Sequence, residues 1–364
     1  MNILVSIKKI DEIKPLIDAG VDEFFCGVMT NEWKKSFSHA GTINATPSYY
    51  NNFKSFDELK QAVDIIHSSN KKVFLTINSY YYTKRQYSEL IDQIKKSIKC
   101  GIDAIIVADL GLLLMLNQEG IKIEIHLSVL NGLFNSDALE FYKDLNVKRV
   151  VLPKQLSLNE TRSIANKNNG IELERFILTS GCLNTESFCR FQHGLIEAKH
   201  PLISKFIFNS QKQDVLMDKF SKGILAKIKK YATDKTILKQ RVACSINYDI
   251  KEKEEHIDKD ELIRIKSNIT QVLSDKHHFE RRNGCCVCSL FDLNKLGIKT
   301  IKLERRGVPL IEKTRDVLFL KKMVNKLSNY KTKEDFIKAS KHEYKNTYKR
   351  ECNDYFCQYK QICN

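Results

Sequence analysis

Residues 71–111 read KKVFLTINSYYYTKRQYSELIDQIKKSIKCGIDAIIVADLG, and this stretch decides the fold class. β-Branched and apolar residues gather at Val73–Asn78 and again at Ala104–Ala108, which predicts two strands. Between them, residues 87–101 carry apolar side chains at the 3.6-residue period of an amphipathic helix and end at Gly101, a typical helix C-cap. A strand, a helix and a second strand in succession predict two parallel strands joined by a crossover helix.

The same alternation extends in both directions along the chain. Further β-branched runs predict strands at Ile3–Ser6, Glu23–Cys26, Ile123–Leu127, Arg149–Leu152, Arg175–Leu178 and Ile298–Leu303. Helical patterns lie between these runs, with Ser55 and Ser157 at N-cap positions and Gly20 at a C-cap position. Because the alternation is strict and contains no Gly-rich dinucleotide-binding turn, it favours an α/β, TIM-like (β/α) barrel of parallel strands over an open sheet.

The pattern divides the chain into four segments. The first, residues 1–194, is the main part of the barrel, and Lys-rich residues 195–282 read as a charged, mainly helical insertion. The alternation of strand and helix patterns returns in residues 283–309, which we expect to complete the barrel. Residues 310–364 are predicted to form C-terminal helices and a Cys-rich tail.

Composition narrows the class of protein. With 364 residues, of which 42% are hydrophobic and 29% charged, the chain is globular rather than collagen-like, coiled-coil or wholly disordered. Its longest apolar run, residues 102–116, is interrupted by Asp103 and Asp109, so we expect no membrane span. The N-terminus lacks the pattern of a secretory signal, and eleven cysteines indicate a reducing compartment, so we expect a cytoplasmic protein.

Charge is distributed unevenly. Basic and acidic residues nearly balance through Ser180, so nearly all of the formal net charge of +16 lies in the second half. A basic half of this kind is typical of proteins that bind nucleic acid or another polyanion, and a protein partner is a further candidate. The competing interpretation is that lysine is simply frequent throughout this chain.

Cysteines gather at two positions that a barrel would bring to one mouth. Cys182 and Cys189 follow the strand predicted at Arg175–Leu178, and Cys285, Cys286 and Cys288 precede the strand predicted at Ile298–Leu303. The C-terminal ends of parallel barrel strands are where sites are built. Thiolates are ligands for iron–sulfur clusters and for zinc, so we expect one of these at Cys182, Cys189, Cys285 and Cys288. Unrelated buried thiols are the alternative.

Further cysteines leave the ligand set open. The sequence contains four more candidates, namely Cys244, Cys352, Cys357 and Cys363. The three in the tail could supply a ligand to the same site, hold a second centre or fasten the tail.

Polar residues at predicted strand ends are candidates for catalysis and substrate binding. Asn78, Asp109 and His126 close three successive strands, where a histidine can move protons near neutral pH and an aspartate can orient it. Capping or hydrogen bonding at a strand–loop junction is the alternative for each. Lys302, Glu304 and Arg305 are candidates for binding an anionic substrate, because arginine suits bidentate contact with a carboxylate. Otherwise they form a solvated strand end.

The order of the segments KKVFLTIN, GIDAIIVADLG, IEIHLS, VKRVVLPKQLSL, ELERFILTSGC and GIKTIKLERRG resembles the U32 peptidase, or collagenase-like, family. The resemblance covers most of residues 1–192 and 284–326. It implies an α/β barrel with a cysteine-held 4Fe-4S cluster. It also implies oxygen-independent hydroxylation of transfer RNA, ribosomal RNA or a quinone precursor, with prephenate as the oxygen donor for some members. Other members carry the label of collagenase or protease.

The resemblance also implies site residues. It places cluster ligands at Cys182 and Cys189 and a third at Cys285, with Cys288 as an alternative. The remaining family cysteine corresponds to Cys244, beyond the insertion, or is replaced by Cys286, Cys288 or a tail cysteine. The family's Lys-Ile-Glu-Gly-Arg-like motif stands here as residues 302–306, KLERR.

Two departures from the family's pattern imply a different substrate. Leu178 and Thr179 stand where many members have His-Gly, and Val129 and Leu130 stand in place of Thr-Gln. The Cys-bearing tail is similar to that of a less characterised subgroup.

Three functions follow as hypotheses. The first is an iron–sulfur hydroxylase-type enzyme that acts on an RNA base or a small organic or peptide substrate. The second is a U32-type peptidase, although the sequence contains neither HExxH nor GxSxG. The third is an RNA-binding module in which the metal centre is structural.

Overall fold

The computed structural model describes residues 1–37, 43–45, 51–168, 170–179, 284–304, 306–352 and 357–359. All of them belong to one compact unit. The insertion that we predict at 195–282 lies outside the described residues. Among the described helices, none combines the length and the apolarity that crossing a membrane requires.

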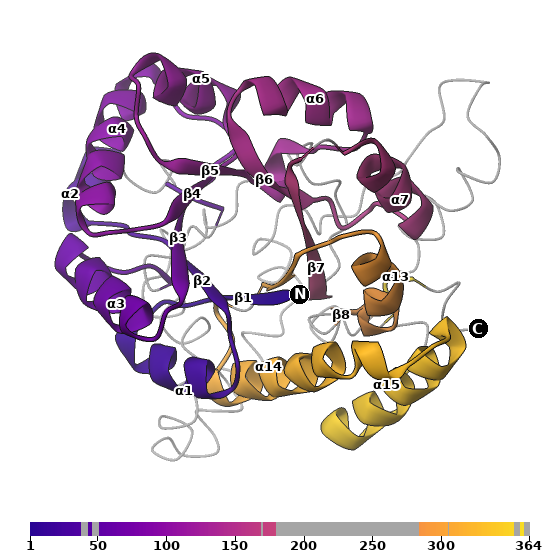
Figure 1. Cartoon of the computed structure of the whole chain (residues 1–364). Coiled ribbons are helices and arrows are strands. Elements are labelled where there is room, and N and C mark those ends of the chain that lie inside the picture. The colour runs from indigo at the N-terminus through magenta and orange to yellow at the C-terminus, as the bar shows by residue number, and fades with distance from the viewer. Residues whose placement is uncertain are drawn as a thin grey trace, which may run out of the picture. The chain divides into compact units, whose positions relative to one another are not determined.

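Within the described residues, eight parallel strands close into a barrel (Figure 1). In chain order they are β1 (Asn2–Ser6), β2 (Glu23–Cys26), β3 (Lys72–Ile77), β4 (Ala104–Val107), β5 (Glu124–Leu127), β6 (Val147–Leu152), β7 (Glu172–Thr179) and β9 (Thr300–Leu303). Each strand through β7 pairs with the next, and β9 lies between β7 and β1. The predicted TIM-like barrel is confirmed, and residues from both sides of the predicted insertion share its sheet.

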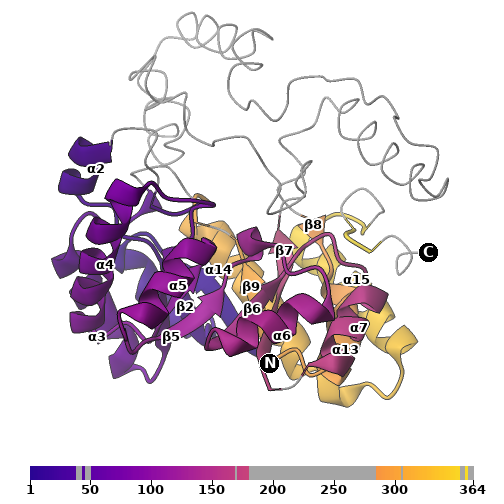
Figure 2. The same cartoon turned by 90° about the horizontal axis from the view of Figure 1, so that it is seen from above.

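Helices surround the barrel, as Figures 1 and 2 show. The α-helices are α1 (Ile13–Asp18), α2 (Asn31–Phe37), α3 (Phe56–Ser68), α4 (Lys84–Lys99), α5 (Leu110–Gln118), α6 (Ser136–Asp144), α7 (Leu158–Lys167), α13 (Leu290–Lys295), α14 (Leu310–Asn325) and α15 (Lys333–Tyr348). Short 3-10 turns are η1 (Ile10–Glu12), η4 (Val129–Asn131), η7 (Val287–Ser289) and η8 (Leu327–Asn329). The two C-terminal helices that the sequence predicts are α14 and α15.

The expected caps are present. Ser55 Oγ accepts a hydrogen bond from the Glu58 amide, and Ser157 forms a capping box with Glu160. Gly20 has a φ of 100°, the left-handed conformation that favours glycine after a helix. Local sequence signals therefore set these helix boundaries.

Strand burial shows why the sheet is parallel. β2 and β4 are buried at every residue, because helices cover one face and the barrel interior covers the other. A small apolar cluster fills part of the interior, and it consists of Leu4, Phe25, Phe74, Ala104 and Ile106. The larger core lies between strands and helices.

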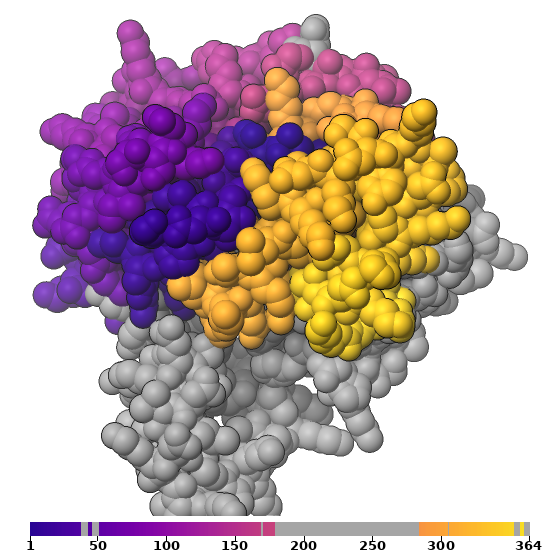
Figure 3. All heavy atoms as spheres, turned by 60° about the horizontal axis from the view of Figure 1, so that its bottom comes forward, coloured from indigo at the N-terminus to yellow at the C-terminus, as the bar shows by residue number. Residues whose placement is uncertain are grey.

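Helix α14, near the C-terminus, packs against the first strand of the barrel and against α1. In Figure 3 the orange and yellow C-terminal residues pack against the indigo N-terminal ones. The contact includes a buried polar link, in which Lys313 Nζ of α14 donates to Ser6 O at 2.9 Å and pairs with Glu12 Oε2 at 3.1 Å. Residues at opposite ends of the chain thus stabilise the same wall.

One strand was not predicted. β8 (Gly284–Cys285) pairs antiparallel with the end of β7, with Leu178 opposite Cys285. A two-residue strand of glycine and cysteine has no periodic signal, so only tertiary pairing reveals it. Its position brings the cysteine-rich segment to the C-terminal end of β7.

Candidate functional site

An ion network occupies the barrel interior. Arg149 of β6 forms a bidentate pair with Glu23 of β2, at 2.6 and 2.9 Å, and also lies 3.4 Å from Glu174 of β7. Lys302 of β9 pairs with the other oxygen of Glu174 at 2.8 Å. All four side chains are buried. Arg149 Nη2 also pairs with the half-exposed Glu172 at 2.9 Å, so three carboxylates share the two cations of this network.

Aromatic rings form cation–π contacts with both basic side chains of the network. The Arg149 guanidinium lies 5.1 Å from the centre of the Phe74 ring, and Lys302 Nζ lies 4.4 Å from the centre of the Phe25 ring. Burial opposes ionisation of Glu174, but Lys302 and Arg149 outweigh it and lower the pKa of Glu174. Glu174 is therefore ionised at neutral pH.

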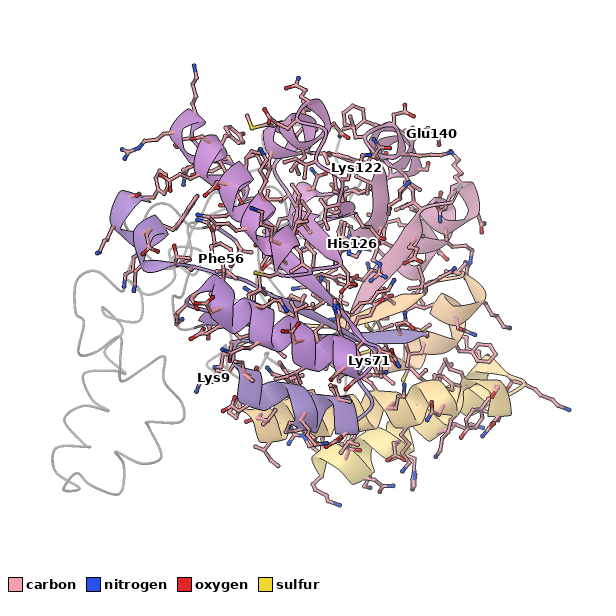
Figure 4. All side chains as sticks on the ribbon, turned by 60° about the vertical axis from the view of Figure 1, so that its left-hand side comes forward. Lys9, Phe56, Lys71, Lys122, His126 and Glu140 are labelled. Atoms are coloured by element: carbon pink, nitrogen blue, oxygen red, sulfur yellow. The ribbon has the colours of Figure 1, made fainter. Side chains whose placement is uncertain are left out.

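His126 lies inside the barrel and not at its mouth, which corrects the position expected from the sequence. Its side chain is fully buried, and its ring meets Phe74 edge-on at 4.6 Å between centroids. In Figure 4, His126 lies toward the middle of the fold, whereas Lys9 and Glu140 lie at its edge. Nε2 lies 2.8 Å from Glu124 Oε1, and within the described part of the chain Nδ1 has no hydrogen-bond partner. Burial lowers the pKa of His126, which favours the neutral ring.

Asn78 and Asp109 lie at strand ends, as expected. The Asn78 amide donates to Ser128 Oγ at 2.9 Å and its oxygen accepts from the Ala45 amide, so it bridges the mouth between β3 and β5. Asp109 is the N-cap of α5 and accepts from the Leu112 amide at 2.6 Å and from Tyr87 OH at 2.8 Å. Its interactions are those of a helix cap, and its catalytic role stays a prediction.

The residues predicted to bind an anion separate in the structure. Lys302 points into the ion network, and Glu304 pairs with Lys154 at 2.6 Å beyond the end of β9. Arg305 lies outside the described residues. Their substrate-binding roles stay predictions.

Sequence reasoning missed Arg306, which is 7% exposed. Its guanidinium reaches across the mouth from the end of β9 to Thr76 Oγ1 of β3 at 3.0 Å. It also donates to Asn44 Oδ1 at 3.2 Å and Asn52 Oδ1 at 3.5 Å. Burial lowers the pKa of Arg306 to about 10. Its place at the end of the KLERR motif was the available signal, since Arg305 and Arg306 both carry the right chemistry.

A cysteine pocket lies beside β8. It is lined by Cys285, Cys286, Cys288, Cys352 and Cys357, together with Val287, Ser289 and Tyr359. Residues separated widely in the sequence therefore meet at the C-terminal end of β7, because β8 pairs there. Of the sequence-predicted ligands, Cys285 and Cys288 come together in this pocket with two tail cysteines.

A buried arginine holds the tail at the pocket. Arg175 of β7 donates to the Tyr359 hydroxyl and to the carbonyls of Pro153 and Leu156. The tail also pairs with the segment of Cys285. The backbone N–H of Gln358 donates to Cys285 O at 2.9 Å, and Cys357 forms an isolated β-bridge with Cys285. The tail cysteines owe their position to this anchoring, which their spacing did not predict.

The sulfur atoms of the pocket differ in their hydrogen bonds. Cys285 Sγ accepts from the Val287 amide at 3.5 Å, the polarity that stabilises a thiolate. Cys286 Sγ instead donates to Ile177 O at 3.3 Å and Phe176 O at 3.4 Å, as a protonated thiol does. Burial raises the pKa of both thiols, that of Cys286 to about 12, so the two cysteines differ in their hydrogen bonds and not in the direction of this shift. The geometry therefore favours Cys285 over Cys286 as a metal ligand.

Thiolate sulfur is the donor that iron–sulfur clusters and zinc share, so the chemistry of this pocket fits either group. Among the described residues, however, no three potential ligands already stand at the mutual geometry of a bound metal ion. The predicted ligands Cys182 and Cys189, and the alternatives Cys244 and Cys363, lie outside the described residues. Ligation at this pocket therefore stays a prediction.

The sequence profile of peptidase family U32 matches residues 8–199, more than half of the chain. This protein belongs to peptidase family U32. The U32 barrel therefore carries the ion network and the cysteine pocket described above.

Relatives of this U32 protein carry different names. An uncharacterized protease of Methanocaldococcus jannaschii is 29% identical over 183 residues, which cover 49% of this chain and 40% of the relative. The tRNA hydroxylation protein P of Helicobacter pylori is 31% identical over 179 residues, covering 49% and 39%. A collagenase of Porphyromonas gingivalis is 23% identical over 197 residues, covering 51% and 44%. The matched part is thus less than half the length of these relatives.

A solved U32 peptidase, Mk0906, aligns with 50% of this chain and 70% of its own at a TM-score of 0.37 and 12% identity. The fold assignment itself rests on the strand order of the barrel.

Proposed function

We propose that this U32 protein is an iron–sulfur enzyme that hydroxylates an RNA base or a small organic substrate without molecular oxygen. The observation that carries the proposal is the convergence of five cysteines from two distant segments on one pocket at the C-terminal end of β7. That end of a parallel barrel is where catalytic residues gather. The names of several relatives, tRNA hydroxylation protein P, favour RNA as the substrate. We also propose that the protein works in the cytoplasm.

The residues of the pocket would have separate roles in holding the cluster and in positioning the tail. Cys285 and Cys288 would hold the cluster with help from Cys352 or Cys357, and Cys182 and Cys189 remain proposed ligands from outside the described residues. When bound, the cluster supplies electron transfer or activation of an oxygen donor, which side chains alone do not provide. Arg175 would keep the tail in place through Tyr359. Zinc is the alternative occupant that metal analysis distinguishes.

Other side chains at or below the mouth would orient the substrate or transfer protons. Asn78, which bridges β3 and β5, is placed to orient a substrate group by hydrogen bonding. His126 is neutral and buried, so it would act as a hydrogen-bond partner or proton carrier from below the mouth. Asp109 would contribute indirectly, because it caps and so positions the start of α5.

Mass spectrometry of RNA nucleosides tests the proposal. Transfer and ribosomal RNA would be compared between a strain that expresses the gene and one that lacks it. We expect a nucleoside heavier by one oxygen atom only in the expressing strain. The Cys285→Ala variant should fail to restore it, whereas the Cys100→Ala variant should restore it, because Cys100 is buried behind α3 and contacts the Phe56 carbonyl.

Three other results would contradict the proposed RNA hydroxylation or favour a different function. Identical nucleoside profiles in the two strains would contradict RNA hydroxylation. Gelatin or peptide cleavage that a point mutation abolishes would favour the peptidase. Unchanged RNA that binds the protein and dissociates steeply with rising salt would favour the RNA-binding module.

A further inference from the structure

Arg306 is a buried cation whose hydrogen bonds all go to neutral groups. Nη1 donates to the side-chain oxygens of Asn44 and Asn52, and Nη2 donates to Thr76 Oγ1. Its Nε is buried and has no hydrogen-bond partner among the residues that the structure describes. Within the described part of the chain, no carboxylate forms an ion pair with Arg306. A positive charge is therefore removed from water without a counter-ion, which is strongly unfavourable by itself.

The nearest candidates for a counter-ion are already neutral or engaged. Cys26 lies close to Arg306, but burial raises the pKa of its thiol to about 12, so it carries no charge at neutral pH. Glu304 is half exposed and pairs with Lys154 at 2.6 Å. Inside the barrel, Lys302 is already matched by Glu174. Arg306 thus has no carboxylate partner of its own among the described residues.

More positive charge surrounds the same point. Lys302 Nζ and the Arg306 guanidinium both face the Phe25 ring, at 4.4 and 5.5 Å from its centre. Lys54 Nζ donates to the backbone oxygen of Asn52 at 2.6 Å, so a further cation adjoins the amide that Arg306 contacts. Three basic side chains thus lie close together here, and among the described residues Arg306 alone of the three is without a nearby acidic partner.

The backbone is shaped to hold this arrangement. A Cβ on Gly27 would lie 2.1 Å from Asn52 Oδ1 and 2.4 Å from Asn44 Nδ2, so only glycine leaves room for the two amides. Asn44 Nδ2 donates to Asn52 Oδ1 at 2.8 Å, and Thr76 Oγ1 donates to Cys26 O at 2.8 Å. These bonds fix the neutral groups, which in turn orient the guanidinium.

From these contacts we infer that Arg306 binds an oxyanion, a carboxylate or a phosphate of the substrate, at the barrel mouth between β9 and β3. The neutral partners on Nη1 and Nη2 orient the guanidinium without cancelling its charge, which leaves that charge for an anionic ligand to balance. The inference does not depend on a cluster in the cysteine pocket, because none of these residues contacts that pocket.

Thermal unfolding of the full chain with inorganic phosphate or acetate tests the inference, with sodium chloride at equal ionic strength as the reference. We expect the specific anion to raise Tm by about 3 °C at a concentration near ten times its Kd. Phosphate and acetate form separate arms. A larger shift with phosphate assigns the site to a phosphate ester, and a larger shift with acetate assigns it to a carboxylate.

Two substitutions make the test specific. Arg306→Met and Arg306→Gln should both lose the anion-dependent shift, and Gln keeps an amide for Thr76 if the Met variant does not fold. Lys60→Gln removes an exposed charge and should keep the shift, as should Cys285→Ala. No shift in the unmodified protein, or an equal shift in the unmodified and Arg306→Gln proteins, would overturn the inference.

Discussion

Arg149 lies in the barrel interior within 3.4 Å of two buried carboxylates, whereas Arg306 lies at the mouth and contacts only neutral oxygens. Both side chains are buried and both face an aromatic ring. The difference is in charge balance. Arg149 is paired with carboxylates, so it supports the fold, whereas Arg306 has no carboxylate partner among the described residues, so an anionic ligand would balance its charge.

The cysteine pocket is the second region that we consider a candidate for ligand binding. Its sulfur atoms gather from β8, η7 and the tail, although a hydrophobic core needs no such concentration of thiols. The ion pairs of the interior support the fold, whereas Arg306 and the gathered thiols are the candidates for ligand binding. Each prediction below compares one kind of region with the other.

The largest effect is expected from breaking the interior network. Arg149→Met leaves Glu23 and part of Glu174 as buried carboxylates without their partner, so the free energy of unfolding should fall by about 3–5 kcal/mol. Urea denaturation measures this change. Lys96→Gln, which breaks an exposed pair with Asp92, should change stability by less than about 1 kcal/mol. Equal effects of the two substitutions would show that the interior network does not support the fold.

A smaller effect is expected at the mouth. Gly27→Ala would press a methyl group against Asn44 and Asn52, which we expect to lower the free energy of unfolding by about 1–3 kcal/mol and to reduce the anion-dependent rise in Tm. Gly307→Ala is the matched control, because its new Cβ would meet only Asn51 at 3.7 Å. If the two alanine variants respond equally to phosphate and acetate, Gly27 does not shape the oxyanion site.

The smallest effect concerns pH. Burial lowers the pKa of His126 in the folded protein. As the pH falls through about 6.5, this histidine therefore takes up a proton in the unfolded chain but stays neutral in the folded protein. Stability from this residue is full above that pH and decreases as pH falls, by up to about 1.4 kcal/mol per unit. Glu124, Arg149 and Glu174 are the charged groups that also influence this titration. His126→Gln should flatten Tm between pH 7 and 5.5, and an unchanged slope would contradict the neutral, buried ring.

The fold was largely predictable from sequence. Alternating strands and amphipathic helices specify a parallel barrel, and capping residues such as Ser157 mark helix ends locally. β8 was missed because a two-residue strand exists only through its pairing with β7. The described barrel strands otherwise match the predicted ones to within a few residues.

The site was less predictable, because it depends on side chains that meet across the barrel. Sequence spacing could not show that Lys302 turns inward to Glu174, or that Arg306 rather than its neighbour spans the mouth as far as Thr76. Alternating charges within a buried strand, as at Glu172 and Glu174, were the overlooked signal for an interior ion network. The role of the tail likewise depends on Arg175, whose contacts are all distant in sequence.

Quantification of iron and acid-labile sulfide in anaerobically purified protein tests the central claim, that the cysteine pocket holds a cluster. The account predicts iron and sulfide together in the unmodified protein and in Cys286→Ala, and their loss in Cys285→Ala. Zinc without sulfide, or a protein that carries neither metal nor sulfide and still has full activity, would contradict it.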